Sequence, residues 1–128
     1  MNTRAVALGT LTDILCTKLF MLALVLVLLD PGSSSQAPLE RLDPALLEGF
    51  CLAWGLFFTG LGGFVAGRLA PHAPLVHGLF VGMVSSIISQ LFYGWTPAEV
   101  GPQLYFLGIV MSLVLAFGGA RLAKLYSR

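Results

Sequence analysis

The segment Thr59-Gly-Leu-Gly-Gly-Phe-Val-Ala-Gly-Arg-Leu-Ala70 has few bulky side chains and belongs to the second of four long apolar stretches. In lipid, helices associate through close van der Waals packing, which needs small residues where the helices touch. Small residues that recur at roughly heptad spacing share one face of a helix. This face predicts a surface on which other helices pack, formed by Gly55, Thr59, Gly62, Gly63, Ala66 and Gly67.

The third and fourth apolar stretches carry small residues at similar spacing. Glycine and alanine are common in membrane helices, so one such stripe says little, whereas several stripes together favour a compact bundle. The residues expected at these contacts are Gly78, Gly82, Gly108, Ser112 and Gly119.

The composition indicates a membrane protein. The 128 residues are 57% hydrophobic and 10% charged, whereas a soluble domain has about 25% charged residues. Four apolar segments, at about 5–29, 44–70, 75–94 and 102–124, are long enough to cross a hydrocarbon core of about 30 Å. We therefore predict one transmembrane domain over residues 1–128, an all-α integral membrane four-helix bundle. The small net charge of +1 offers no basic surface for nucleic acid.

The distribution of basic residues predicts the orientation. With four crossings, both termini and the second loop share one side of the membrane, which would hold Arg4, Arg68, Arg121, Lys124 and Arg128. The opposite side would hold only Arg41. Cytoplasmic loops carry an excess of Lys and Arg, so both termini are expected in the cytoplasm.

Four polar residues within the apolar segments are candidates for chemistry: Asp13, Thr17, Lys18 and Gln90. A charge at the bilayer centre costs about 2.5–3.5 kcal/mol on the insertion scale. Two hypotheses remain open, polar contacts between helices or a site for an ion, a proton or a ligand. Asp13 and Thr17 share a helix face, while Lys18 lies about 140° from Asp13 around the helix.

Basic side chains and a histidine at the expected cytoplasmic boundary are candidates for lipid headgroups: Arg68, His77, Arg121 and Lys124. His72 and His77 suggest a metal pair, but the sequence shows no third ligand, so no metal site is predicted. A tetrapyrrole ligand role for His77 has no further support, and no cofactor is predicted. Cys16 and Cys51 both lie in apolar segments and are expected to be free thiols.

An internal repeat is one further hypothesis. The segment 63–70 that ends the second stretch resembles the segment 118–123 that ends the fourth, and Gly9-x-x-x-Asp13 parallels Gly78-x-x-x-Gly82. The chain would then be two hairpins of the same orientation. Chance similarity between helices rich in glycine and alanine is the alternative.

The motifs Gly9-x-x-x-Asp13, Gly62-Gly-Phe-Val-Ala-Gly-Arg-Leu-Ala70 and His77-Gly78-x-x-x-Gly82 resemble those of an uncharacterised family of small bacterial four-helix membrane proteins (YrzE-like). The resemblance implies location in the bacterial inner (plasma) membrane and no established activity. Small multidrug resistance transporters are also similar in size and in having a carboxylate in the first helix. Their acid is a glutamate, however, and their other motifs are missing here.

These observations predict a non-catalytic protein that packs against itself or serves as an accessory subunit of a membrane complex. The expected partners are membrane lipids and other membrane subunits. The sequence contains no zinc-protease motif, phosphate-binding loop or nucleophile elbow, so enzymatic activity is not expected. The alternative function is a small homo-oligomeric transporter, coupled to an ion or a proton, that uses the polar residues of the first helix.

Overall fold

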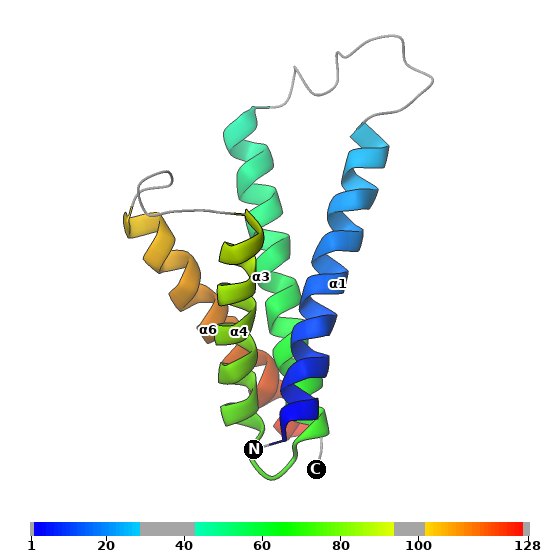
Figure 1. Cartoon of the computed structure of the whole chain (residues 1–128), viewed down its shortest axis with the longest axis vertical. Coiled ribbons are helices and arrows are strands. Elements are labelled where there is room, and N and C mark those ends of the chain that lie inside the picture. The colour runs from blue at the N-terminus through cyan, green and yellow to red at the C-terminus, as the bar shows by residue number, and fades with distance from the viewer. Residues whose placement is uncertain (1, 29–42, 94–101, 127–128) are drawn as a thin grey trace.

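The computed structural model describes residues 2–28, 43–93 and 102–126, and these form four helices (Figure 1). They are α1 (Thr3–Leu28), α3 (Pro44–Leu69), α4 (Pro74–Tyr93) and α6 (Pro102–Tyr126). The predicted all-α four-helix fold is confirmed, and the predicted limits that fall on described residues lie within two residues of the observed ones. Arg41 and Arg128, which entered the charge argument, lie outside the described residues, as do the predicted limits at 29 and 94.

Local sequence explains where the helices begin. The first residues of α3, α4 and α6 are Pro44, Pro74 and Pro102, and proline suits the first helical position because no hydrogen bond is needed from its nitrogen there. The start of α1 is instead capped by Asn2, whose Oδ1 accepts a 3.3 Å hydrogen bond from the backbone N–H of Ala5.

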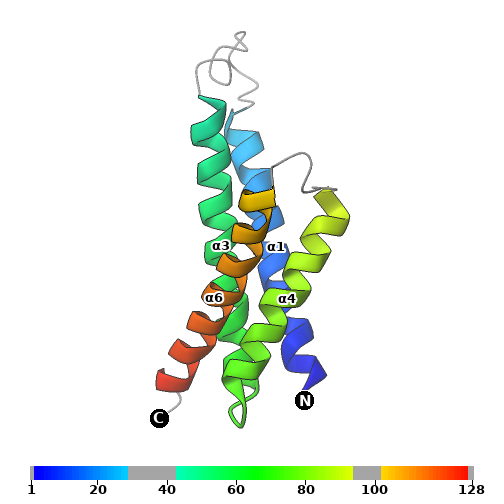
Figure 2. The same cartoon turned by 90° about the vertical axis from the view of Figure 1, so that its left-hand side faces the viewer.

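The helices form two antiparallel hairpins with the same orientation, α1 with α3 and α4 with α6 (Figure 1). Residues 70–73 turn between α3 and α4 at the end of the bundle where both chain termini lie, here named the terminal end. The hairpins contact each other through the parallel pairs α3 with α6 and α1 with α4, and through the antiparallel pair α3 with α4. Figure 2 shows the second hairpin inclined to the first.

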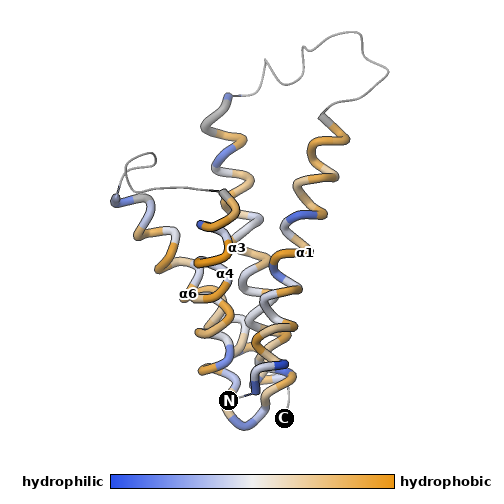
Figure 3. Tube along the Cα trace, viewed as in Figure 1, coloured by the Kyte–Doolittle hydropathy of each residue, from blue (hydrophilic) through white to orange (hydrophobic). Residues whose placement is uncertain are grey.

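All four helices are long and apolar enough to cross a membrane, and apolar residues run along each of them (Figure 3). Large apolar side chains point outward, for example Leu19, Leu91 and Leu125. The buried interior consists mostly of small residues, and Val81 is the largest fully buried side chain among the described residues. Lipid must therefore solvate the outside of the bundle, and the chain is a multi-pass membrane protein.

The contact between α1 and α3 is a backbone contact between two glycines. A Cβ atom added to Gly62 would lie 2.5 Å from the carbonyl oxygen of Gly9, and one added to Gly9 would lie 2.6 Å from that of Gly62. Real Cβ atoms do not approach backbone so closely, so both positions require glycine. Gly9 was predicted only as part of a motif, and the structure adds it to the packing residues.

Glycines also set the contacts of α6. A Cβ atom on Gly63 would collide with the carbonyl group of Ala116, and one on Gly119 with that of Gly60. On the α4 side, a Cβ atom on Gly78 would lie 2.7 Å from the Ala116 carbonyl oxygen. A Cβ atom on Gly67 or Gly82 would lie 3.0 Å from its nearest neighbour, which is tight but not a collision. Thr59, Ala66 and Ser112 are buried.

Two of the glycines predicted at helix contacts do not make them. A Cβ atom added to Gly55 or to Gly108 would meet nothing within 4 Å. Both lie toward the end of the bundle away from the termini, where the helices fan out (Figure 1). There longer side chains bridge the gaps: Phe20 of α1 stacks on Trp54 of α3 with ring centroids 5.0 Å apart.

Candidate functional site

The carboxyl group of Asp13 is buried where α1, α3 and α4 meet. Only 5% of the residue is exposed. Thr59 Oγ1, on α3, donates a 3.1 Å hydrogen bond to Asp13 Oδ2, and Thr17 Oγ1, one turn along α1, lies 3.5 Å from Oδ1. Asp13 and Thr17, predicted to share a face, are therefore brought together with a residue predicted only for packing.

This group lies at about half the depth of the bundle. Asp13 is ten residues beyond Thr3, the start of α1, and Thr59 is ten residues before Leu69, the end of α3. At 1.5 Å per residue each is about 15 Å from the terminal end, which is about half of a 30 Å hydrocarbon core. The carboxyl group is therefore placed near the membrane midplane.

Two further hydroxyl groups near Asp13 remain without a partner. Ser85, on α4, is 3% exposed and lies close enough to interact with the Asp13 carboxyl group, yet its Oγ meets no hydrogen-bond geometry. Thr10, on α1, is 5% exposed, and its Oγ1 also has no hydrogen-bond partner among the described residues. Buried hydroxyl groups are usually hydrogen-bonded, so these two are unusual, and the Ser85 hydroxyl is the one that adjoins the Asp13 carboxyl group.

The Thr59 hydroxyl has two acceptors for its one proton. Its oxygen lies 3.1 Å from Asp13 Oδ2 and also 3.1 Å from the backbone oxygen of Gly55. A hydroxyl group donates one hydrogen bond and accepts others. Thr59 can therefore donate to the carboxylate, or donate to Gly55 and turn its lone pairs toward Asp13.

A shallow, apolar groove of about 450 Å³ follows the seam between α1 and α4. It begins at Thr3, near the terminal end, and extends to Ile14 and Ile88. Thr10 lies along it. Because Asp13 is three residues from Thr10 on the same helix, the groove reaches the edge of the buried polar group.

The second hairpin carries a neutral counterpart of the Asp13–Thr59 pair. Ser86 Oγ and Ser112 Oγ are 2.5 Å apart, joining α4 to α6. A shift of 53 positions relates Thr59 to Ser112 and Gly67-Arg-Leu-Ala70 to Ala120-Arg-Leu-Ala123. A shift of 73 relates Gly9-x-x-x-Asp13 to Gly82-x-x-x-Ser86, an alignment one helical turn from the predicted one to Gly78-x-x-x-Gly82.

Lys18 and Gln90 do not join this group. Lys18 is exposed on α1, and its Nζ lies 5.5 Å from the ring centroid of Phe92, near the far end of α4. Its long side chain thus carries the charge away from the midplane. Gln90 Oε1 accepts a hydrogen bond from the hydroxyl group of Tyr105, which ties α4 to α6.

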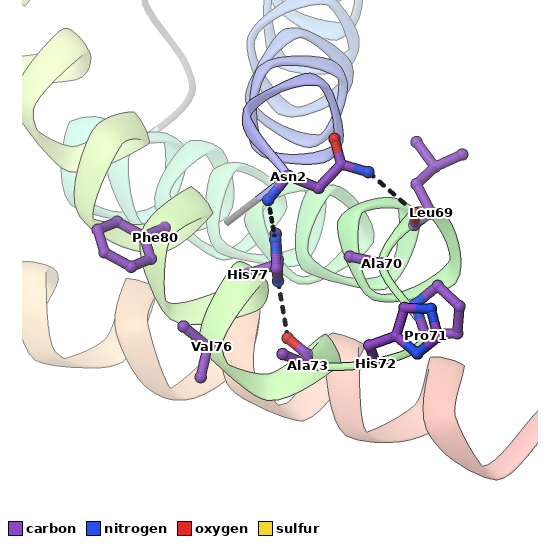
Figure 4. A pocket seen from close by; sticks show the side chains of 9 residues that line it. All are labelled: Asn2, Leu69, Ala70, Pro71, His72, Ala73, Val76, His77 and Phe80. Carbon is purple, nitrogen blue, oxygen red and sulfur yellow. Dashed lines mark hydrogen bonds between the residues drawn. The ribbon is translucent and has the colours of Figure 1, made fainter.

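At the terminal end, His77 ties the start of α1 to α4 (Figure 4). His77 is 5% exposed, its Nε2 accepts a 2.9 Å hydrogen bond from the backbone N–H of Asn2, and its Nδ1 lies 2.8 Å from the Ala73 carbonyl oxygen. The ring is therefore the neutral tautomer that carries its proton on Nδ1. Sequence analysis missed this contact because the two residues are 75 positions apart.

These residues border a hollow of about 600 Å³ at the terminal end, lined also by Leu69, His72 and Phe80 (Figure 4). The headgroup candidates surround the same end. Arg68, Arg121 and Lys124 are exposed, and Arg68 Nη1 donates a 3.0 Å hydrogen bond to the backbone oxygen of Tyr126. His77 has both nitrogens engaged inside the bundle, which leaves none facing a headgroup. Headgroup binding by the other three stays a prediction.

Cys16 and Cys51 are free thiols. Within the three described segments, no three or more His, Cys, Asp or Glu side chains converge on a point that would hold a metal ion.

Comparison with known proteins gives one relative of stated function. No protein-family model matches the chain, and no solved structure matches it. The chain is 37% identical over 98 residues to "Ammonium transporter 1 member 1" of Solanum lycopersicum, in an alignment that covers 69% of this chain and 20% of the transporter. The chain thus spans about a fifth of the length of that relative.

Proposed function

We propose that this chain is a small membrane transport protein, or part of one, that moves a proton or a small cation through the polar site around Asp13. The single observation that carries the proposal is a carboxyl group buried at half depth, on the seam between the two hairpins. An ionisable residue inside a membrane is costly and commonly marks the path of an ion or a proton.

An internal repeat, if the two hairpins are one, would support the same function. Many transporters are built from internal repeats, and their sites lie near the midplane where the repeats meet. Here Asp13 of the first hairpin lies beside Ser85 of the second. The similarity to part of an ammonium transporter gives support from an independent direction. A homo-oligomer in the plasma membrane of a bacterium, with both termini in the cytoplasm, is the assembly we propose.

Flux through liposomes tests the proposal. Purified protein is reconstituted into liposomes, and the entry of protons, ammonium, Na⁺ and K⁺ is followed separately under an imposed voltage with a dye that reports each ion. We expect flux above that of empty liposomes and a loss of at least tenfold in Asp13→Asn. Lys18→Met, which alters a charge outside the site, should keep the flux. Equal flux in Asp13→Asn and wild type, or no flux above empty liposomes, would reject the proposal.

A second candidate is the non-catalytic packing subunit of a larger membrane complex. The observation that favours it is the set of close backbone contacts between helices at Gly9, Gly62, Gly63 and Gly119. These contacts hold the bundle together without any polar side chain. Purification in mild detergent separates the two candidates. A stoichiometric larger partner together with absent flux supports the subunit, and flux by the isolated protein rejects it as the main function.

A further inference from the structure

The oxygen atoms around Asp13 form a set that a metal or ammonium cation would recognise. Asp13 contributes two carboxylate oxygens, and Thr59 and Ser85 contribute a hydroxyl oxygen each. Hydroxyl and carboxylate oxygens are the donors that hard cations prefer. The donors come from α1, α3 and α4, so the site exists only in the folded bundle.

We infer that this set binds one small monovalent cation, of the class of Na⁺, K⁺ or NH₄⁺, at Asp13, Thr59 and Ser85. The inference rests on the proposed function and specifies the ligand of the same site. It goes further because it names the class of ion and the oxygen atoms that would bind it.

Charge balance selects the monovalent class. Asp13 is the one acidic side chain buried among the described residues, so its carboxylate neutralises a single positive charge. A divalent ion would leave a net charge near the midplane, where an uncompensated charge is strongly unfavourable.

The unpaired hydroxyl groups are the second line of evidence. Ser85 Oγ and Thr10 Oγ1 are almost fully buried and make no hydrogen bond to the described residues, and a buried hydroxyl group without a partner is unfavourable. A cation bound beside Ser85 would be coordinated by a lone pair of the Ser85 Oγ atom. Thr59 also fits, because donation of its proton to the Gly55 carbonyl group leaves its own lone pairs for the cation.

The groove between α1 and α4 gives the ion a direction of approach. It runs from Thr3 at the terminal end to Thr10, the hydroxyl group next to the site. Its walls are mostly apolar, and α1 and α4 contact each other less than any other neighbouring pair in the described bundle. Thr3 and Thr10 are the groove's polar lining residues, and Thr10, three residues before Asp13 on α1, is the one next to the site.

Thermal unfolding of the full chain in detergent measures cation binding without transport. Each chloride salt of Na⁺, K⁺ and NH₄⁺ is titrated against choline chloride at constant ionic strength. A ligand that binds only the folded state raises the melting temperature in a saturable way. We expect a saturable rise for at least one of the three ions in wild type and none in Asp13→Asn.

Serine variants keep the test informative if Asp13→Asn fails to fold. Ser85→Ala should move the midpoint of the titration to at least tenfold higher salt. Ser89→Ala removes an exposed hydroxyl one turn away on the same helix and should leave the midpoint unchanged. No saturable rise over choline in wild type would overturn the inference, as would equal midpoints in wild type and Ser85→Ala.

The two proposals fail differently. Proton flux that depends on Asp13, without any saturable effect of the three cations, overturns the cation site and leaves the transport proposal standing. Saturable binding lost in Ser85→Ala, without flux in liposomes, supports the cation site and rejects transport.

Discussion

Thr59 Oγ1 lies 3.1 Å from Asp13 Oδ2 and joins α3 to α1 at half the depth of the bundle. Hydrogen bonds between membrane helices contribute about 0.6 kcal/mol on average and at most about 1.7 kcal/mol. We therefore expect Thr59→Val to lower the free energy of unfolding by about 0.5–1.5 kcal/mol, measured by reversible unfolding in mixed micelles. The matched control is Thr12→Val, because the Thr12 hydroxyl donates only to Leu8 of its own helix and its loss should have a smaller effect.

Substitution of Gly63 tests the close contact of α3 with α6. A methyl group there meets the backbone carbonyl of Ala116, which cannot rotate away, so the helices must separate. Forcing an added methyl group into a packed interior costs about 1–3 kcal/mol, and Gly63→Ala should lose at least that much stability.

Gly108→Ala is the control, because it makes the same substitution at a position without a close neighbour. Its methyl group meets nothing within 4 Å, and alanine is favoured over glycine in a helix by about 1 kcal/mol. The variant should be as stable as wild type or slightly more stable. Similar losses in Gly63→Ala and Gly108→Ala would contradict the contact as the cause, because the higher helix propensity of alanine predicts no loss at Gly108.

Replacement of His77 tests the contact at the start of α1. His77→Leu removes the acceptor for the Asn2 backbone N–H, so the first turn of α1 should exchange its amide hydrogens about tenfold faster, as measured by hydrogen–deuterium exchange. His72→Leu, at an exposed position of the same turn, should leave that exchange unchanged. Fast exchange of the first turn in wild type would contradict the contact.

The contact between Lys18 and Phe92 is expected to be weak. A cation over an aromatic ring contributes about 0.5–2 kcal/mol. A double-mutant cycle of Lys18→Met and Phe92→Leu should give a coupling energy within that range. A coupling energy of zero would place the Lys18 ammonium elsewhere.

Labelling with a membrane-impermeant thiol reagent tests the topology. In a background of Cys16→Ala and Cys51→Ala, single cysteines are placed at the exposed positions 72 and 126. Because residues 70–73 and the end of α6 lie at the same end of the bundle, both cysteines should react from one side only, the cytoplasmic side. Reaction of the two from opposite faces would disprove the bundle as described.

Local signals in the sequence were enough for the helices and much of their packing. The prolines at 44, 74 and 102 set helix starts, and the small-residue face of α3 is where α1 and α6 touch it. Gly55 and Gly108 follow the same small-residue spacing as the contacting glycines, but they face open space. How far the helices diverge at that end depends on the packing of the whole bundle. Ser85 joins Asp13 only through the register of α1 against α4, which no local pattern specifies.

The placement of the glycine contacts has a mechanical consequence. The backbone contact that joins the two hairpins, Gly63 of α3 against Ala116 of α6, lies within about 15 Å of the terminal end, at 1.5 Å per residue. A small rotation of one hairpin on the other about this contact would displace the tips far from the chain termini the most.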